Sequence, residues 1–122
     1  DIDVIWDFFE SVTGWKTLRQ EWYETNGLRI LNLQRAMLLL GGPDLKWRAN
    51  RDDENPARFY EPLPSGPYKG KVVKKKSFVK SKQEYYEAVG WDKNGLPKPE
   101  TLRKLGLQDV ETKLKRAQIS RS

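Results

Sequence analysis

The sequence predicts an all-α protein, a multihelical domain with one long buried helix and a long proline-rich strap. Apolar side chains recur at spacings of three and four between residues 15 and 40, which is the periodicity of a helix face. Paired signals for helix starts and stops recur after residue 80. Between residues 43 and 67, five prolines prevent any long regular element.

The first twelve residues are expected to form a short amphipathic helix. Ile5, Phe9 and Val12 fall on one side of it, at helical spacing. The pattern begins without a clear N-terminal cap, so we expect this helix to continue a segment further upstream. A structural role is the interpretation we favour for it.

The long helix is expected to begin at the capping box Thr17-Leu-Arg-Gln20 and to end at Gly41. Asn26-Gly27 is a weak point within it, where a kink or a close backbone approach is expected. Only four polar residues interrupt the apolar surface between positions 28 and 40: Arg29, Asn32, Gln34 and Arg35. A helix that is hydrophobic nearly all round is normally surrounded by protein. We therefore expect it to be one buried piece of a larger body.

Residues 41–70 are expected to form an extended strap, pinned to a surface by recurring apolar anchors: Phe59, Tyr60, Leu63 and Tyr68. The strap also carries a run of charged residues that could be read as a metal or acid/base site: Arg48, Arg51, Asp52, Asp53 and Glu54. Adjacent carboxylates with no apolar pocket are usually solvated. We therefore favour a solvated cluster over a catalytic one.

Seven lysines lie between residues 69 and 82. The favoured interpretation is a solvated loop, since an unpatterned charge run specifies little. The second is docking of an acidic protein, with Lys74, Lys75 and Lys76 as the partner-binding residues. Nucleic acid is the weakest of the three, because no helix-turn-helix, zinc finger or RNA-binding signature accompanies the lysines.

Three further helices are expected in the C-terminal part. The first opens at a second capping box, Ser81-Lys-Gln-Glu84, and closes at Gly90. The second starts at Pro97-Lys-Pro99, since proline is favoured in a first helical turn. The third runs from residue 108 and gives way to a basic tail. The predicted organisation is thus a helical domain over residues 1–114 and a disordered tail over residues 115–122.

Composition narrows the possible chemistry. The 122 residues include no cysteine and no histidine. Disulfides, the common zinc sites, iron–sulfur ligation and nucleophile–histidine catalysis are therefore excluded within this chain. The net charge of +6 is compatible with an acidic partner. No apolar stretch reaches the ~20 residues that span a membrane, so we expect a cytoplasmic protein without membrane contact.

Three blocks together resemble the C-terminal domain of the tungsten-containing aldehyde ferredoxin oxidoreductase family. The first joins Val12-Thr-Gly-Trp15 to Gly27-Leu-Arg-Ile-Leu-Asn-Leu-Gln-Arg-Ala36. The second lies within residues 52–70, and the third within residues 84–107. They occur in the family's order and cover most of the chain.

This resemblance implies a helical domain that helps enclose the cofactor of a three-domain enzyme. Full-length members of the family oxidise aldehydes to carboxylic acids and pass electrons to ferredoxin. They use a tungsten, sometimes molybdenum, bis-pterin cofactor and a [4Fe–4S] cluster, whose ligands are cysteines. This chain has none, and its Leu38-Leu-Leu-Gly-Gly42 replaces the family's usual pattern after the helix.

No catalytic or metal-binding residue is carried over from the family. Asn32 and Arg35 are the candidates for contact with the cofactor domain, as polar groups on an otherwise buried helix. Each needs hydrogen-bonding partners or costs on the order of 1–3 kcal/mol. The interpretation we favour for both is structural: they anchor the backbone of the strap.

Two hypotheses on function follow. In the first, the chain is the helical tail of a tungstopterin oxidoreductase, with a scaffold role and no catalysis in this stretch alone. Its partners are then the N-terminal domains of the parent enzyme, and ferredoxin at the lysines. In the second, it is a stand-alone basic helical adaptor that binds an acidic protein or nucleic acid. Self-association through the apolar helix is expected if that helix is left exposed.

Overall fold

The computed structural model describes residues 2–16, 18–41 and 47–119. These residues form α1 (Ile2–Thr13), α2 (Arg19–Trp22), the π-helix η1 (Tyr23–Gly27), α3 (Leu28–Leu40), α4 (Ala49–Asp52), the 3-10 helix η2 (Ala57–Tyr60), α5 (Lys75–Ala88), α6 (Pro99–Lys104) and α7 (Gln108–Ile119). The described residues contain no β-strand, only an isolated antiparallel bridge between Trp91 and Pro97. The predicted all-α class is confirmed.

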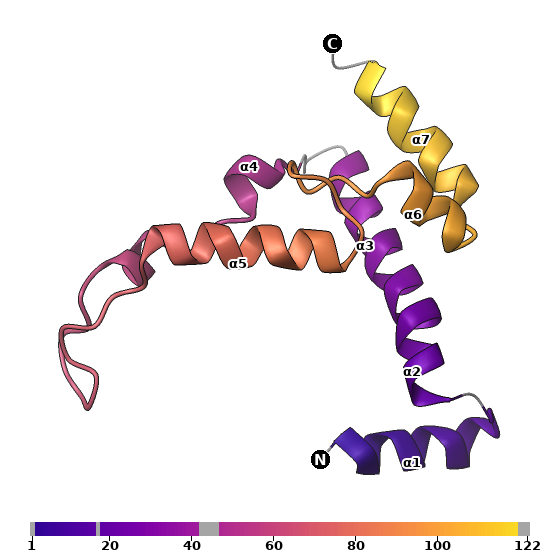
Figure 1. Ribbon diagram of the computed structural model, residues 1–122, viewed down its shortest axis with the longest axis horizontal. Coiled ribbons are helices and arrows are strands. Elements are labelled where there is room, and N and C mark those ends of the chain that lie inside the picture. Colours follow the sequence, from indigo (N-terminus) through magenta and orange to yellow (C-terminus); the bar gives the residue numbers. More distant parts are fainter. Residues whose placement is uncertain (1, 17, 42–46, 120–122) are drawn as a thin grey trace.

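The long predicted helix corresponds to α2, η1 and α3, which follow one another along the chain (Figure 1). The wider turn of η1 ends on Asn26 and Gly27, where the sequence predicted a weak point. A π-turn of this kind accommodates one extra residue in the helical path. Gly41 ends α3 with a φ of 72°, as predicted. Thr17 of the predicted capping box lies outside the described residues.

Helix α3 is buried on one side only. Its buried residues are Asn32, Arg35, Ala36 and Leu39. The opposite side exposes Ile30, Leu33 and Met37, with Met37 65% accessible. Within this chain the helix is therefore only partly covered, as expected of one piece of a larger body, and its cover by such a body remains a prediction. Its polar pair points inward, and much of its apolar surface faces outward.

The main core joins α3 to α6 and α7. Ala36 and Leu39 of α3 pack with apolar side chains from the C-terminal helices: Leu102, Leu105, Leu107, Val110 and Leu114. Leu102 is one of the most completely buried side chains, 1% exposed. Arg29 adds a polar link, since its Nε donates a hydrogen bond to the carbonyl of Leu105 at 2.9 Å. The C-terminal helices are thereby fixed to one face of α3.

Helix α1 contacts the rest of the chain through aromatic rings. The ring centroid of Phe9 lies 5.6 Å from that of Trp22 in α2, in an edge-to-face arrangement. Trp6 approaches the same indole at 6.1 Å. Much of the apolar surface of α1 is nevertheless uncovered, since Val4, Ile5, Phe8 and Val12 are each 65–71% exposed. This helix therefore presents a second apolar face.

Helix α5 begins six residues earlier than predicted, at Lys75, so the capping box expected at Ser81 is wrong. The segment before Ser81 was interpreted as a loop because of its charge. Lysine, however, is a good helix former, and Phe78 lies eight residues before Tyr86 on the same side of the helix. Figure 1 shows α5 projecting from α3 on the side opposite α6 and α7.

The strap contains only short helical turns among its described residues, α4 and η2, as its prolines predicted. Phe59, Leu63 and Tyr68, expected to pin it to a surface, are 44–61% exposed. Tyr60 is the exception among the predicted anchors, because its hydroxyl donates a hydrogen bond to Glu54. The strap is thus fixed at residues 47–55, while residues 61–72 extend away from the helices (Figure 1).

Helix α7 extends to Ile119 and so includes residues 115–119 of the expected disordered tail. Lys115 stabilises this extension by pairing with Glu111 at 2.6 Å, four residues earlier. Residues 120–122 lie outside the described part of the chain. The division into a domain ending at residue 114 and a separate tail remains a prediction.

Glu111 gives a testable link between α6 and α7. It accepts hydrogen bonds from Arg103 at 2.7 and 2.8 Å. The hydrogen bonds from Arg103, and then that from Lys115, lower the pKa of this carboxyl to about 2. A depressed carboxyl pKa stabilises the folded state above the ordinary value of 4.5, and this contribution is lost as the pH falls towards 2.

Replacing Glu111 with glutamine is therefore expected to lower the unfolding midpoint at pH 7 and to flatten its decline between about pH 4.5 and 2. Urea unfolding at several pH values, followed by circular dichroism, measures both effects. Glu100→Gln is the matched control, because Glu100 is an exposed carboxylate on α6. Parallel pH profiles for wild type and Glu111→Gln would contradict the expectation.

Candidate functional site

The two candidate residues on α3 are the centre of a buried polar cluster. Asn32 is fully buried and Arg35 is 4% exposed. They lie three residues apart and so share one side of the helix. The segments that meet them are the C-terminal end of α5 with its following turn, and the strap at residue 53. The structure thus brings together residues that are far apart in the sequence.

Asn32 joins α3 to the end of α5. Its Nδ2 donates to the carbonyl of Leu28 at 2.9 Å and to that of Val89 at 3.3 Å. Its Oδ1 accepts a hydrogen bond from the indole Nε1 of Trp91 at 2.9 Å. This one side chain therefore satisfies both a backbone carbonyl and an indole N–H that would otherwise be buried without partners.

Arg35 fixes both the strap and the turn that follows α5. Its Nε donates to the carbonyl of Gly95 at 2.9 Å. Its two terminal nitrogens hold the carboxylate of Asp53, and Nη1 lies 2.9 Å from Oδ1. The guanidinium carbon also lies 4.4 Å from the ring centroid of Trp91, within cation–π range. Arg35 thus anchors the strap through the side chain of Asp53.

Asp53 is the second charged member of the cluster, with 14% of its side chain exposed. Besides Arg35 it accepts hydrogen bonds from Nε1 of Trp47 at 2.9 Å and from the hydroxyl of Tyr86. Burial alone would raise the pKa of Asp53, but the hydrogen bonds from Arg35 and Tyr86 outweigh it and hold that pKa below its usual range. Burial, and then the bond to Asp53, raise the pKa of Tyr86.

Gly95 is required for the close approach of the turn to Arg35. It has a φ of 72°, in the left-handed region that glycine favours. A Cβ at this position would meet the guanidinium of Arg35 and lie 3.0 Å from the Cβ of Ala49. The turn is closed by a 2.9 Å hydrogen bond from the Gly95 amide to the carbonyl of Asp92. The turn from Asp92 to Gly95 is therefore part of the cluster.

Sequence reasoning missed three members of the cluster as such: Asp53, Tyr86 and Trp91. Asp53 was placed in a solvated run of charges. A signal was available, because a buried arginine requires a carboxylate, and the strap supplies several. The choice of Asp53 depends on its contact with Arg35, which spans 18 residues, and on its hydrogen bond from Tyr86, which spans 33. No local pattern specifies either contact.

The three candidate partner-binding lysines lie away from this cluster, where the strap enters α5. Lys74 precedes the helix, and Lys75 and Lys76 begin it. Their side chains are exposed. Lys75 lies 3.7 Å from a carboxylate oxygen of Glu54 and faces the ring of Tyr60 at 5.5 Å. Lys74 and Lys76 therefore present their charge most freely to a partner.

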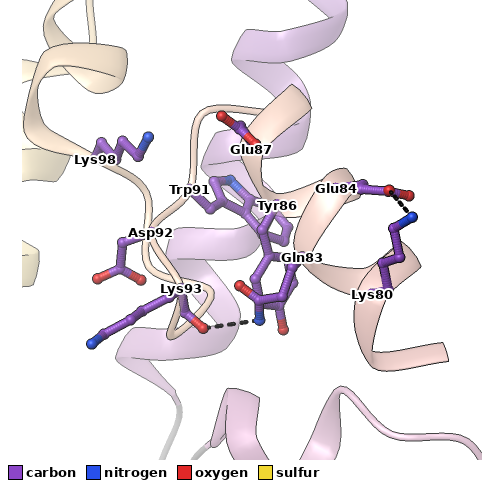
Figure 2. A pocket seen from close by; sticks show the side chains of 9 residues that line it. All are labelled: Lys80, Gln83, Glu84, Tyr86, Glu87, Trp91, Asp92, Lys93 and Lys98. Carbon is purple, nitrogen blue, oxygen red and sulfur yellow. Dashed lines mark hydrogen bonds and ion pairs between the residues drawn. The ribbon is translucent and has the colours of Figure 1, made fainter. Parts of the chain in front are cut away.

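A cavity of about 540 Å³ lies between α5 and the turn after it, and Figure 2 shows the side chains that line it. Tyr86 and Trp91 form its aromatic wall, and Gln83 crosses it to donate a hydrogen bond to the carbonyl of Lys93 at 3.2 Å. Its remaining lining residues are charged and of both signs: Lys80, Glu84, Glu87, Asp92, Lys93 and Lys98. This mixture attracts neither an anion nor a cation preferentially.

The residues of this chain do not fit an iron–sulfur cluster, because it contains no cysteine. The described residues also contain no group of three or more histidine, cysteine, aspartate or glutamate side chains able to hold a metal ion. The hydrogen bonds of Asn32 and Arg35 described above are made within the chain. Contact of these two residues with a cofactor-bearing domain remains a prediction.

Among the described residues, no helix is both long and apolar enough to cross a membrane.

Comparison of the sequence with known proteins finds similarity to one family of oxidoreductases. The family model described as aldehyde ferredoxin oxidoreductase, domains 2 and 3, matches residues 1–107. An aliphatic sulfonate oxidoreductase, WOR-like subunit, from Pyrococcus furiosus is 45% identical over 110 residues, which cover 90% of this chain and 18% of that protein.

Tungsten-containing aldehyde ferredoxin oxidoreductases show a lower similarity. Those of Pyrococcus furiosus and Pyrococcus horikoshii are each 34% identical over 104 residues, which cover 84% of this chain and 16% of those proteins. The chain therefore spans less than a fifth of the length of these curated relatives.

Proposed function

Because this chain belongs to the aldehyde ferredoxin oxidoreductase family, we propose that it is a helical scaffold segment of a larger tungsten oxidoreductase. The observation that carries the proposal is the exposed apolar side of α3, at Ile30, Leu33 and Met37. An apolar face of this kind marks an interaction site. The other domains of the parent enzyme would cover it.

The polar cluster supports a scaffold role. Arg35 and Asp53 tie the strap to α3, and Asn32 ties α3 to the end of α5. The packing side of α3 is thus fixed by hydrogen bonds while its apolar side stays available. Catalysis would take place elsewhere in the parent, where a tungsten or molybdenum bis-pterin cofactor and a [4Fe–4S] cluster would be held by residues outside this chain.

The parent enzyme would oxidise an aldehyde to a carboxylic acid and pass the electrons to ferredoxin. A second candidate substrate class is the aliphatic sulfonates, because the relative named for them is 45% identical, against 34% for those named for aldehydes. The Leu38-Leu-Leu-Gly-Gly42 sequence, which begins in the last turn of α3, also departs from the pattern usual in the aldehyde enzymes.

The deciding experiment determines the intact mass and metal content of the native polypeptide that carries this sequence. A chain several times heavier than 14.3 kDa, with tungsten or molybdenum and iron, is the expected result. Assays with aldehydes and with aliphatic sulfonates, using a small artificial electron acceptor, then separate the two substrate classes. A metal-free native product near 14.3 kDa would overturn the proposal in favour of a basic adaptor.

The proposed contact with ferredoxin gives a prediction for the lysines. Changing Lys74, Lys75 and Lys76 together to glutamate is expected to slow electron transfer to an acidic ferredoxin roughly tenfold at low salt. The reason is that exposed charges at the rim of an interface mainly speed encounter. The effect should shrink as salt rises, because exposed charges are then screened.

Stopped-flow reduction of ferredoxin by the parent enzyme measures this rate at several salt concentrations. Changing Lys93, Lys104 and Lys113 to glutamate is the matched control, since these exposed lysines lie elsewhere and give the same change in net charge. Equal rates for the two triple variants would show that the position of the charges on the surface has no effect. This result would contradict docking of ferredoxin at Lys74, Lys75 and Lys76.

A further inference from the structure

The loop between η2 and α5 encloses an apolar groove that the polar cluster does not use. Its volume is about 680 Å³. The apolar side chains that line it are Phe59, Pro62, Leu63, Pro64, Tyr68, Val72 and Val73. Figure 1 shows this loop at the far end of α5, away from α3, α6 and α7. We call residues 57–74 the groove loop.

The groove loop is closed by its own backbone hydrogen bonds. The Leu63 amide donates to the carbonyl of Lys71 at 3.0 Å, and the Gly70 amide donates to the carbonyl of Leu63 at 2.9 Å. A third bond joins the Val73 amide to the carbonyl of Phe59 at 3.2 Å. The shape of the groove is therefore set before anything binds, which reduces the entropy lost on association.

The apolar side chains of the groove are uncovered in spite of this order. Leu63, Tyr68 and Val72 are 48%, 61% and 46% exposed. Isolated exposed apolar residues are ordinary on a protein surface, but a contiguous set that lines a groove marks an interaction site.

Charge identifies the partner that fits the groove. Residues 57–76 carry six cations and one carboxylate. The cations are Arg58, Lys69, Lys71, Lys74, Lys75 and Lys76. Two of them, Arg58 and Lys71, line the groove itself together with Glu61. The apolar floor thus lies in a strongly positive segment, and a complementary surface is acidic with an apolar centre.

We propose that the groove loop binds an acidic protein partner, which inserts an aliphatic or aromatic side chain between Leu63 and Val72. The surrounding cations pair with carboxylates around that anchor. This arrangement follows the usual anatomy of an interface, with a desolvated apolar centre and a polar rim. The inference rests on the proposed function in that the partner docks on the parent oxidoreductase.

The groove favours a protein over a nucleic acid. Single-stranded nucleic acids bind by stacking bases on open aromatic faces. Here Lys71 Nζ lies over the ring of Tyr68, 4.7 Å from its centroid, and Arg58 lies over that of Phe59 at 6.0 Å. One face of each ring is therefore taken by a cation of the same loop. The remaining floor is proline, leucine and valine, which suits an inserted apolar side chain.

Photo-crosslinking in the native host tests the proposal. Tyr68 is replaced by benzoylphenylalanine in the complete polypeptide that carries this chain, and crosslinked products are identified by mass spectrometry. The expected product joins position 68 to a separate acidic polypeptide, at a site flanked by aspartate and glutamate. Crosslinks within the parent polypeptide, crosslinks to nucleic acid or the absence of any crosslink would each overturn the proposal.

The purified partner then allows a quantitative test on the parent enzyme. Leu63→Ser and Val72→Ser are each expected to raise the Kd about tenfold or more, both at low salt and at 1 M salt, because apolar contacts are not screened. Val79→Ser is the matched control, since Val79 is 41% exposed but lies on α5, outside the groove. Equal affinities for all three variants would refute the groove as the docking site.

Two further measurements distinguish a failure of the groove proposal from a failure of the proposed function. The metal content of the groove variants and their activity with a small artificial acceptor are expected to equal those of the wild type. A loss of docking with both retained leaves the proposed function intact. A parent polypeptide without tungsten, molybdenum or iron would instead overturn the proposed function, whatever the groove binds.

Discussion

Replacing Asp53 with alanine is expected to lower the free energy of unfolding of the structure around α3 by about 3–5 kcal/mol. This is the typical cost of removing one partner of a buried ion pair. Arg35, 4% exposed, would keep its charge in the protein interior without a counter-charge. Trp47 Nε1 and the hydroxyl of Tyr86 would lose their acceptor in the same step. The strap would then be released from α3.

Urea unfolding of the parent polypeptide, combined with hydrogen exchange at the amides of residues 89–96, measures this effect. Asp52→Ala is the matched control, because Asp52 pairs with Arg51, whose side chain is 64% exposed, and such surface pairs contribute about 0–1 kcal/mol. The double variant Arg35→Met with Asp53→Leu is expected to recover much of the loss, since it leaves no charge unpaired. An Asp53→Ala variant as stable as Asp52→Ala would show that the ion pair is not a structural anchor.

The helices were largely predictable because their signals are local. The periodicity before Gly41 gave the long helix, and Gly41 itself ended it as expected. The start of α5 was not predictable in the same way, since a run of lysines suits both a solvated loop and an exposed helical turn. The choice depends on tertiary contacts, such as the approach of Lys75 Nζ to a carboxylate oxygen of Glu54 at 3.7 Å. Such contacts cannot be read from the segment alone.

Only the two site residues on α3 could be predicted from the sequence, and their partners could not. Burial of a polar side chain on an apolar helix is a local feature, and it identified Asn32 and Arg35. Their partners Asp53, Trp91 and Gly95 lie 18 to 60 residues further along the chain. Pairing across such distances depends on how the strap and the turn after α5 fold back. The sequence therefore indicated that partners must exist without indicating which residues they are.

The second large effect concerns the exposed apolar side of α3. Met37→Asp is expected to prevent stable assembly of this segment with the rest of the parent enzyme. Within this chain Met37 is 65% exposed, so the carboxylate would remain in water there and cost little. In the assembled parent the same position would be covered. The change would remove about 1.5–3 kcal/mol of apolar burial and add the cost of burying a charge.

Thermal unfolding and metal analysis of the purified parent enzyme measure this effect. Gln34→Asp is the control, because Gln34 is an exposed residue of the same helix and the substitution introduces the same charge and helix propensity. Total stabilities of 5–15 kcal/mol leave little margin for a loss of several kcal/mol, so Met37→Asp should lower both the unfolding midpoint and the retained metal. If both variants retained metal and stability equally, the apolar side of α3 would face solvent in the parent as well. The scaffold role would then have to rest on another uncovered apolar surface, such as the one that Val4, Ile5 and Phe8 form on α1.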